Sequence, residues 1–181
     1  EGFMKFYTGI DLHSTNSFIG ILDEKLNRVT KKRVPNNKEV ILKFLEPYKK
    51  DIEVVAVEST YNWYWLVDAL QDEGYRVKLA NPAAMKQYEG IKYLDDEHDA
   101  FWLARMLVLG ILPEGYIYPR PERGVRDLLR QRSYLVTQKT SLKLRLQWFF
   151  ANAEGVSLSN NTIEKMEEKE FDSLLKEGAV H

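Results

Sequence analysis

Short apolar segments separated by polar turns occupy the first 35 residues of the chain, and they predict β-strands. Residues 4–11 and 17–23 are largely apolar, whereas residues 28–34 alternate between apolar and polar side chains, which is typical of a more exposed strand. The polar turn at residues 23–27 is short enough to join two antiparallel neighbours. The chain therefore begins with strands that include a predicted antiparallel hairpin.

Helical and strand patterns alternate after this hairpin. Apolar residues recur at helical spacing after Asn37, a residue type that favours the position just before a helix. Residues 53–57 form a continuous apolar strand, which suits burial on both faces. A second helical pattern ends at Gly74, and residues 75–80 form a fifth strand. Strands joined through helices favour parallel pairing, so this order predicts a mixed five-stranded sheet of the ribonuclease-H-like kind.

The second half of the chain is predicted to be helical. Helices are expected at residues 94–109 and 122–152, followed by a linker at 153–161 and a polar helix at 162–176. The second of these helices carries apolar residues at seven-residue spacing, which are Leu128, Leu135, Leu142 and Phe149. A single apolar stripe indicates that this helix packs on the domain or on a partner helix.

Composition narrows the class of protein. A chain of 181 residues suits one domain with a core and an appendage. It has no cysteine, which excludes disulfides and thiolate metal sites and fits a reducing compartment. The longest apolar stretch, residues 106–112, is too short to span a bilayer, and no secretion signal is visible at the N-terminus. We therefore expect a cytoplasmic protein without a membrane partner.

The net charge of −1 hides an uneven distribution of charge. Basic residues strongly outnumber acidic ones between Tyr118 and Phe150, whereas the final stretch is acidic. We predict that six basic side chains of this helix bind nucleic acid, namely Arg120, Arg123, Arg126, Arg130, Lys139 and Lys143. The alternative is that they form the solvated face of an amphipathic helix. Phosphate contacts would position a nucleic acid without reading its sequence.

Four acidic residues are candidates for a metal site. Asp11 and Glu58 each end a predicted buried strand, and ligands of open α/β sheets bind at the carboxyl ends of strands. Asp96 and Asp99 are three residues apart near the start of a helix, so they share one helix face. Converging carboxylates suit Mg²⁺ or Mn²⁺, and two such ions about 4 Å apart promote phosphodiester transfer. The pattern therefore predicts a site that cuts nucleic acid.

Each of these acids also has an ordinary structural interpretation. The helix pair could be first-turn acids favoured by the helix dipole, and the strand-end pair could belong to a turn or a helix cap. The occurrence of all four in this order, on this strand plan, favours the metal site. His13 and His98 lie near the acids in sequence and are candidates for a ligand or a general base, although a lone surface histidine is more often neither.

Four segments together resemble one protein family in order and spacing. They are Tyr-Thr-Gly-Ile-Asp at 7–11, Val-Glu-Ser-Thr-Tyr-Asn-Trp at 57–63, Val-Lys-Leu-Ala-Asn-Pro at 77–82 and Asp-Glu-His-Asp-Ala at 96–100. Over residues 4–152 the chain resembles the N-terminal domain of the DEDD transposases, the insertion-sequence-110 family, which is related to the Piv DNA invertases. The family often has Lys-Thr just before the third acid, where this chain has Leu94 and Asp95.

The resemblance implies an α/β, RuvC-like domain with a ribonuclease-H-like mixed five-stranded sheet, followed by a long C-terminal helical extension. The implied organisation is a catalytic domain at 4–118, a basic amphipathic helix for nucleic-acid binding or dimerisation at 119–152, and a linker with a polar helix at 153–181. The implied catalytic and metal-binding tetrad, with Mg²⁺ or Mn²⁺ as cofactor, is Asp11, Glu58, Asp96 and Asp99.

The implied activity is that of a metal-dependent transposase or recombinase that cleaves and transfers DNA strands. The implied partners are DNA, for some members a guide (bridge) RNA, and further copies of the chain in a dimer or tetramer. In the family a C-terminal domain supplies a serine that works with the tetrad of another protomer. This sequence ends at His181 without such a domain, so we expect it to be an incomplete catalyst.

Three alternatives remain open from the sequence. The first is a RuvC-like nuclease or Holliday-junction resolvase. The second is an ATP-binding half like those of actin and the sugar kinases, because residues 9–16 are similar to the first phosphate-binding hairpin of that class; His13 stands where that class prefers glycine, and no second lobe or Gly-rich adenosine motif is visible. The third is a non-catalytic module that binds nucleic acid and dimerises through the basic helix.

Overall fold

The structure is a computed structural model, and it describes residues 4–86, 98–167, 169, 170 and 173. The chain divides into two compact units, Glu1–Ile117 and Tyr118–His181. Within the described residues, no helix combines the length and the apolar character that crossing a membrane requires.

The first unit is built on one sheet with the strand order β3-β2-β1-β4-β5-β6. The strands are β1 (Phe6–Leu12), β2 (Asn16–Asp23), β3 (Arg28–Pro35), β4 (Ile52–Glu58), β5 (Val77–Ala80) and β6 (Glu114–Gly115). The first three strands pair antiparallel, whereas β4 runs parallel to β1 and β5 runs parallel to β4. This mixed, ribonuclease-H-like order confirms the predicted α/β fold class.

The sheet has one strand more than the five that the sequence predicts. Gly115 and Glu114 pair antiparallel with Leu79 and Ala80, which makes β6 the edge strand beside β5. A strand of two residues is too short to show an alternating pattern, and its identity depends entirely on the neighbour with which it pairs.

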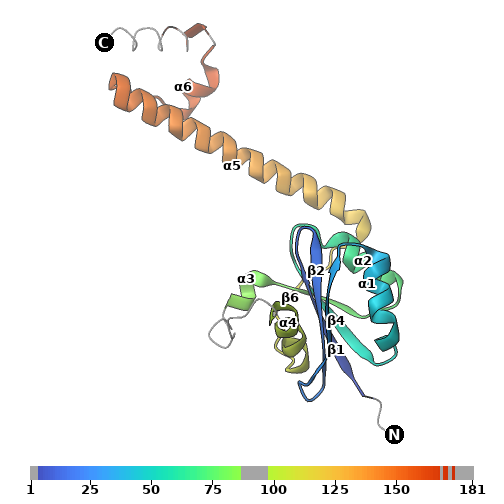
Figure 1. The fold of residues 1–181 in the computed structure, drawn as a ribbon. Helices are drawn as coiled ribbons and strands as arrows, with labels where there is room; N and C mark the ends of the chain where they lie inside the picture. The colour runs from blue at the N-terminus through green and yellow to red at the C-terminus, as the bar shows by residue number, and fades with distance from the viewer. Residues whose placement is uncertain (1–3, 87–97, 168, 171–172, 174–181) are drawn as a thin grey trace. The chain divides into compact units, whose positions relative to one another are not determined.

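The helices of the first unit lie on both faces of the sheet. They are α1 (Lys38–Leu45), the 3-10 turn η1 (Glu46–Tyr48), α2 (Tyr64–Asp72), α3 (Pro82–Met85) and α4 (His98–Val108). Helices α1 and α2 cover one face, and α4 packs on the other (Figure 1). The predicted cap of α1 is confirmed, because the side chain of Asn37 accepts a hydrogen bond from the backbone N–H of Val40.

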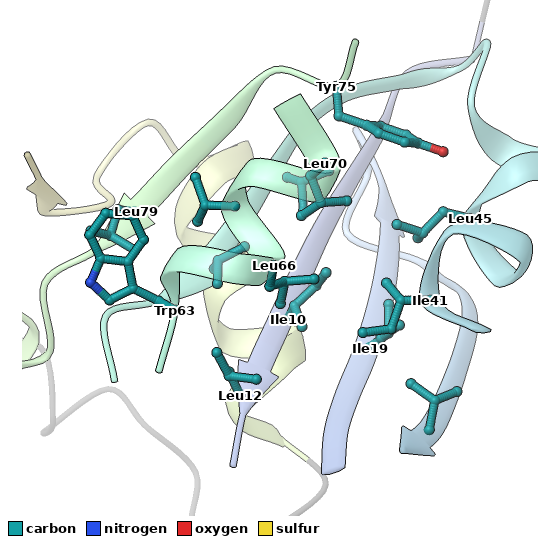
Figure 2. Packing of buried hydrophobic residues seen from close by; sticks show 14 of the residues in the cluster. Ile10, Leu12, Ile19, Ile41, Leu45, Trp63, Leu66, Leu70, Tyr75 and Leu79 are labelled. Carbon is teal, nitrogen blue, oxygen red and sulfur yellow. The ribbon is translucent and has the colours of Figure 1, made fainter. Parts of the chain in front are cut away.

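Alternate residues of the central strands supply two apolar layers. On the α1/α2 face, Ile10 and Val57 pack with helix residues such as Leu66, and all three are fully buried. Figure 2 shows Ile10 of β1 and Leu66 of α2 in this layer. On the α4 face, Ala56 packs with Leu103 in a second cluster. Strand β4 is therefore buried on both faces, as its continuous apolar run predicts. Burying one large aliphatic side chain contributes about 1.5–3 kcal/mol.

Two glycines allow α4 to lie directly against the sheet. Gly9 of β1 pairs with Gly20 of β2 across the antiparallel ladder. A Cβ added to Gly9 would stand 1.9 Å from the carbonyl oxygen of Ala100, and one added to Gly20 would stand 2.8 Å from the ring of Phe101. Because both positions lack a Cβ, the backbone of α4 approaches the backbone of β1. This contact places Asp99, the residue before Ala100, close to the sheet.

The second unit contains the helices α5 (Arg120–Glu154) and α6 (Asn160–Lys165). Helix α5 ends at Gly155, whose φ of 64° is in the left-handed region that glycine adopts readily. The expected single helix over residues 162–176 is wrong in its bounds. Helix α6 begins at Asn160 and stops before Met166, which takes an extended conformation.

Candidate metal centre

The sheet register places Asp11 beside Glu58. Ile10 pairs with Val57 across the parallel strands β1 and β4. Asp11 is the residue after Ile10, and Glu58 is the residue after Val57. Neighbouring strands lie about 4.8 Å apart, so the two acids occupy adjacent positions at the carboxyl end of the sheet. The sequence predicts the order of the strands along the chain, and the pairing of β1 with β4 in the structure brings these two side chains together.

Both carboxylates lie on the face that α4 covers. Asp11 has the same parity along β1 as Gly9, which faces the backbone of α4. Glu58 has the same parity along β4 as Ala56, which packs in the cluster formed with α4. Because successive strand residues point to opposite faces, Asp11 and Glu58 both project toward the helix that carries Asp99.

A pocket of about 200 Å³ joins β4 to α3 and α4 at this end of the sheet. Its lining residues are Glu58, Pro82, Met85, Lys86, Asp99, Trp102 and Leu103. Two of the predicted acids, one from a strand and one from a helix, therefore line the same pocket. Its other walls are mostly apolar, and Lys86 contributes a cation.

Asp11 is held in place by burial and by a histidine. Only 4% of its surface is exposed. Nε2 of His13 lies 2.9 Å from Oδ2 of Asp11. The loop of His13 is anchored in turn, because the His13 carbonyl oxygen accepts hydrogen bonds from Nδ2 of Asn36 at 2.9 Å and Nδ2 of Asn62 at 3.4 Å. The turns that follow β3 and β4 thus fix the histidine that contacts the carboxylate.

The remaining predicted acid, Asp96, lies outside the described residues, as does the side chain of His98. Among the residues that are described, no group of three or more acidic, histidine or cysteine side chains is close enough to hold a metal ion. In the described part, Asp11 and Glu58 occupy neighbouring positions of the sheet, and Glu58 and Asp99 line the same pocket. Their joint role as metal ligands stays a prediction.

Three residues at this end of the sheet were not anticipated from the sequence. Asn36 and Asn62 hold the His13 loop, and Lys86 lines the pocket. Asn81, which follows the predicted fifth strand, caps α3, since its side chain accepts a hydrogen bond from the N–H of Ala84. This cap was the available signal for Lys86, because the short helix that it begins, Pro82–Met85, is followed directly by that lysine.

The basic residues at the start of α5 interact within the second unit. Arg123 is buried, and its Nε donates a hydrogen bond of 2.9 Å to the carbonyl oxygen of Tyr118. The guanidinium of Arg126 lies 3.0 Å from Asp127 and 4.7 Å from the centre of the Tyr118 ring. These contacts show that the first turns of α5 use two of the predicted phosphate ligands to hold their own structure.

Two further predicted ligands face an acid of α6. Lys139 and Lys143 both form ion pairs with Glu164. Hydrogen bonds from Lys139 and then Lys143 lower the pKa of Glu164 to about 2. Arg120 and Arg130 are exposed. Nucleic-acid binding by the six residues stays a prediction, and phosphate would have to compete with Glu164 for the two lysines.

Comparison with known proteins places the chain among DNA-processing domains. The sequence model of the insertion-sequence-110 type of DEDD transposase, described as "Transposase", matches residues 8–153. No curated protein matches the chain. Among solved structures, T. thermophilus RuvC in complex with Holliday junction substrate is similar with a TM-score of 0.44 and 18% sequence identity, covering 61% of this chain and 99% of the RuvC chain.

Proposed function

We infer the function of this chain from its family: the chain belongs to the DEDD transposases of the insertion-sequence-110 type. It is therefore a domain of the DNA transposase and nuclease kind. We propose that it supplies the divalent-metal site for cleavage and transfer of DNA strands, acting with a serine-bearing domain. The proposed metal ligands are Asp11, Glu58, Asp96 and Asp99. Family membership favours this function over the ATP-binding and non-catalytic alternatives.

One observation carries the proposal: Glu58 and Asp99 line a single pocket, and Asp11 is the register neighbour of Glu58. Carboxylate oxygens are the donors that Mg²⁺ and Mn²⁺ prefer, so these side chains fit such an ion. When bound, the ion supplies Lewis acidity at a phosphoryl oxygen and activates the attacking oxygen.

The other residues around the pocket have supporting roles in this proposal. His13 orients Asp11 through the contact between Nε2 and Oδ2, as residues behind metal ligands commonly do. Lys86 offers an ammonium group to a DNA phosphate beside the two carboxylates. Trp102 and Leu103 form an apolar wall of the pocket.

Metal binding by the purified chain tests this function. Loss of a residue that only supports a metal ligand costs about 10–100-fold in metal affinity. Glu58→Gln removes a proposed direct ligand, so it should weaken Mn²⁺ binding by at least this factor. Calorimetric titration measures the affinity. Glu53→Gln is the matched control, since Glu53 lies on the same strand but forms ion pairs with Lys5 and Arg76 at its other end. Equal affinities in both variants would refute the proposed site.

We also propose that α5 pairs with α5 of a second copy of the chain. Its seven-residue apolar positions are exposed in the single chain, with 72% of Leu128, 56% of Leu135 and 58% of Leu142 accessible. Exposed apolar residues at this spacing are typical of helices that pair. DNA, and a guide RNA where one is used, would be further partners of the assembled protein.

The association state of two variants tests this pairing. Leu135→Lys should convert a dimer or larger assembly into a monomer in analytical ultracentrifugation, because a charge would be buried in the apolar seam. Ser141→Lys adds the same charge on the opposite side of α5 and should leave the assembly intact. A monomeric wild-type chain, or dissociation by both variants alike, would contradict the pairing.

A further inference from the structure

A row of side chains runs across the sheet from Asp11 to the edge strand β3. Asp11 pairs with Phe18 of β2, and Phe18 pairs with Arg33 of β3. Residues directly opposite each other in antiparallel strands point to the same face. Arg33 therefore lies on the same face as the carboxylates, two strand spacings or about 10 Å from Asp11.

Two more cations of β3 share this face. Lys31 pairs with Gly20, whose missing side chain faces the ring of Phe101 in α4. Arg28 pairs with Leu22, and its guanidinium lies 4.5 Å from the centre of the same Phe101 ring. The second contact is independent of the register and agrees with it. Arg28, Lys31 and Arg33 thus form one cationic row, and all three are exposed.

The remaining cation of β3 points the other way. Lys32 pairs with Ile19, which belongs to the core on the α1/α2 face. Its Nζ atom lies 5.6 Å from the centre of the Phe44 ring of α1. Lys32 therefore serves as a control for Lys31, because the two lysines are neighbours on β3 but lie on opposite faces of the sheet.

The position of the row favours an anionic ligand. Residues 26–38, which carry the row, contribute no acidic side chain of their own, so an acidic partner of these cations comes from another part of the chain. Helix α4 packs on β1, β2 and β4, so the row on β3 borders the helix. Nε of Arg33 donates a 2.9 Å hydrogen bond to Oδ1 of Asn16, which fixes the guanidinium at the end of β3 nearest Asp11.

Cations on an edge strand also prevent edge-to-edge aggregation. Protection against aggregation requires only that the edge strand carry cations, on either of its faces. It does not explain why Arg33, Lys31 and Arg28 all lie on the carboxylate face, with Arg33 level with Asp11. A polyanion lying along β3 would use the row and would reach the carboxylates at its end.

We propose that Arg33, Lys31 and Arg28 bind consecutive phosphates of the DNA strand that enters the carboxylate site. This phosphate-binding row is a surface of the first unit and does not involve the basic residues of α5. The choice of DNA as ligand rests on the proposed function. The contacts themselves require no metal, so they can be tested separately from the metal site.

Salt dependence of DNA binding tests the row. Fluorescence anisotropy of a labelled duplex, without divalent metal, gives the slope of log affinity against log salt concentration. Each lost phosphate contact lowers the slope by about 0.9, so Lys31→Ala with Arg33→Ala should lower it by about 1.8. Lys32→Ala should leave the slope unchanged, and an equal loss in that control would overturn the proposal. Wild-type Mn²⁺ affinity in the double variant would show that the metal site is intact.

Crosslinking provides a second, direct measurement. The chain has no cysteine, so a single cysteine carries a photoreactive label at one chosen position. Arg33→Cys should crosslink to the duplex, and Lys32→Cys should not. Crosslinking from both positions, or from neither, would contradict the row. An RNA of the same sequence that competes better than DNA would show that the row serves RNA instead. If Glu58→Gln fails to weaken metal binding while the row behaves as expected, only the catalytic proposal is lost.

Discussion

Replacing Gly9 with alanine should destabilise the first unit by about 3 kcal/mol, the upper end of the usual cost of overpacking a core. The new Cβ would stand 1.9 Å from the carbonyl oxygen of Ala100 and 2.8 Å from the backbone nitrogen of Ala104. Both are backbone atoms, so no side-chain rotation relieves the clash and α4 itself must move. Because Asp99 precedes Ala100, this movement should also separate Asp99 from Glu58 and weaken Mn²⁺ binding.

Chemical denaturation followed by tryptophan fluorescence measures this effect. Trp148 is the one tryptophan of the second unit, so a Trp148→Phe background limits the signal to the first unit. Gly115→Ala is the control, since its added Cβ would meet Leu79 at an ordinary 3.5 Å. If the two substitutions cost the same free energy of unfolding, the close approach of α4 to β1 is not what positions the helix.

Asp11→Asn should weaken Mn²⁺ binding by about 100-fold or more, because losing an outer-shell partner alone costs about 10–100-fold. Asparagine preserves the size of the side chain and its ability to accept a hydrogen bond from Nε2 of His13. The substitution therefore removes the negative charge and little else. Electron paramagnetic resonance measures the Mn²⁺ affinity of the wild-type chain and of the variant.

His13→Ala separates the ligand from the residue that orients it. Its loss should be smaller than that of Asp11→Asn, because the carboxylate remains while its orientation is freed. Asp11 is 4% exposed and lies on the face of the sheet that α4 covers, so much of its position is set without the histidine. A larger loss of Mn²⁺ affinity in His13→Ala than in Asp11→Asn would indicate that the histidine itself binds the metal.

The candidate acids could be found from the sequence because each has a local signature. Asp11 and Glu58 end apolar runs, and Asp99 lies near the start of an amphipathic helix. The supporting residues had weaker signatures. Asn36 and Asn62 are turn residues of a common type, and what makes them significant is a shared partner, the carbonyl oxygen of His13. No local pattern reveals a hydrogen bond between residues 49 positions apart.

The basic helix α5 shows that a local charge pattern does not reveal which cations already have an acidic partner. Lys139 and Lys143 are predicted phosphate ligands because their own helix contains few acidic residues. Their acidic partner, Glu164, lies on a different helix, 21 positions from Lys143. Charge counted within one element does not include charge that folding brings to it.

The sequence by itself indicated the five longer strands, the Asn37 cap of α1 and the candidate acids, because periodicity and capping depend on neighbours within a few residues. The tertiary structure decided which face each side chain joins. A period of two shows that Lys31 and Arg33 share a face and Lys32 does not. Only the pairing of β3 with β2, and the packing of α4 at Gly9 and Gly20, decides that the shared face is that of Asp11.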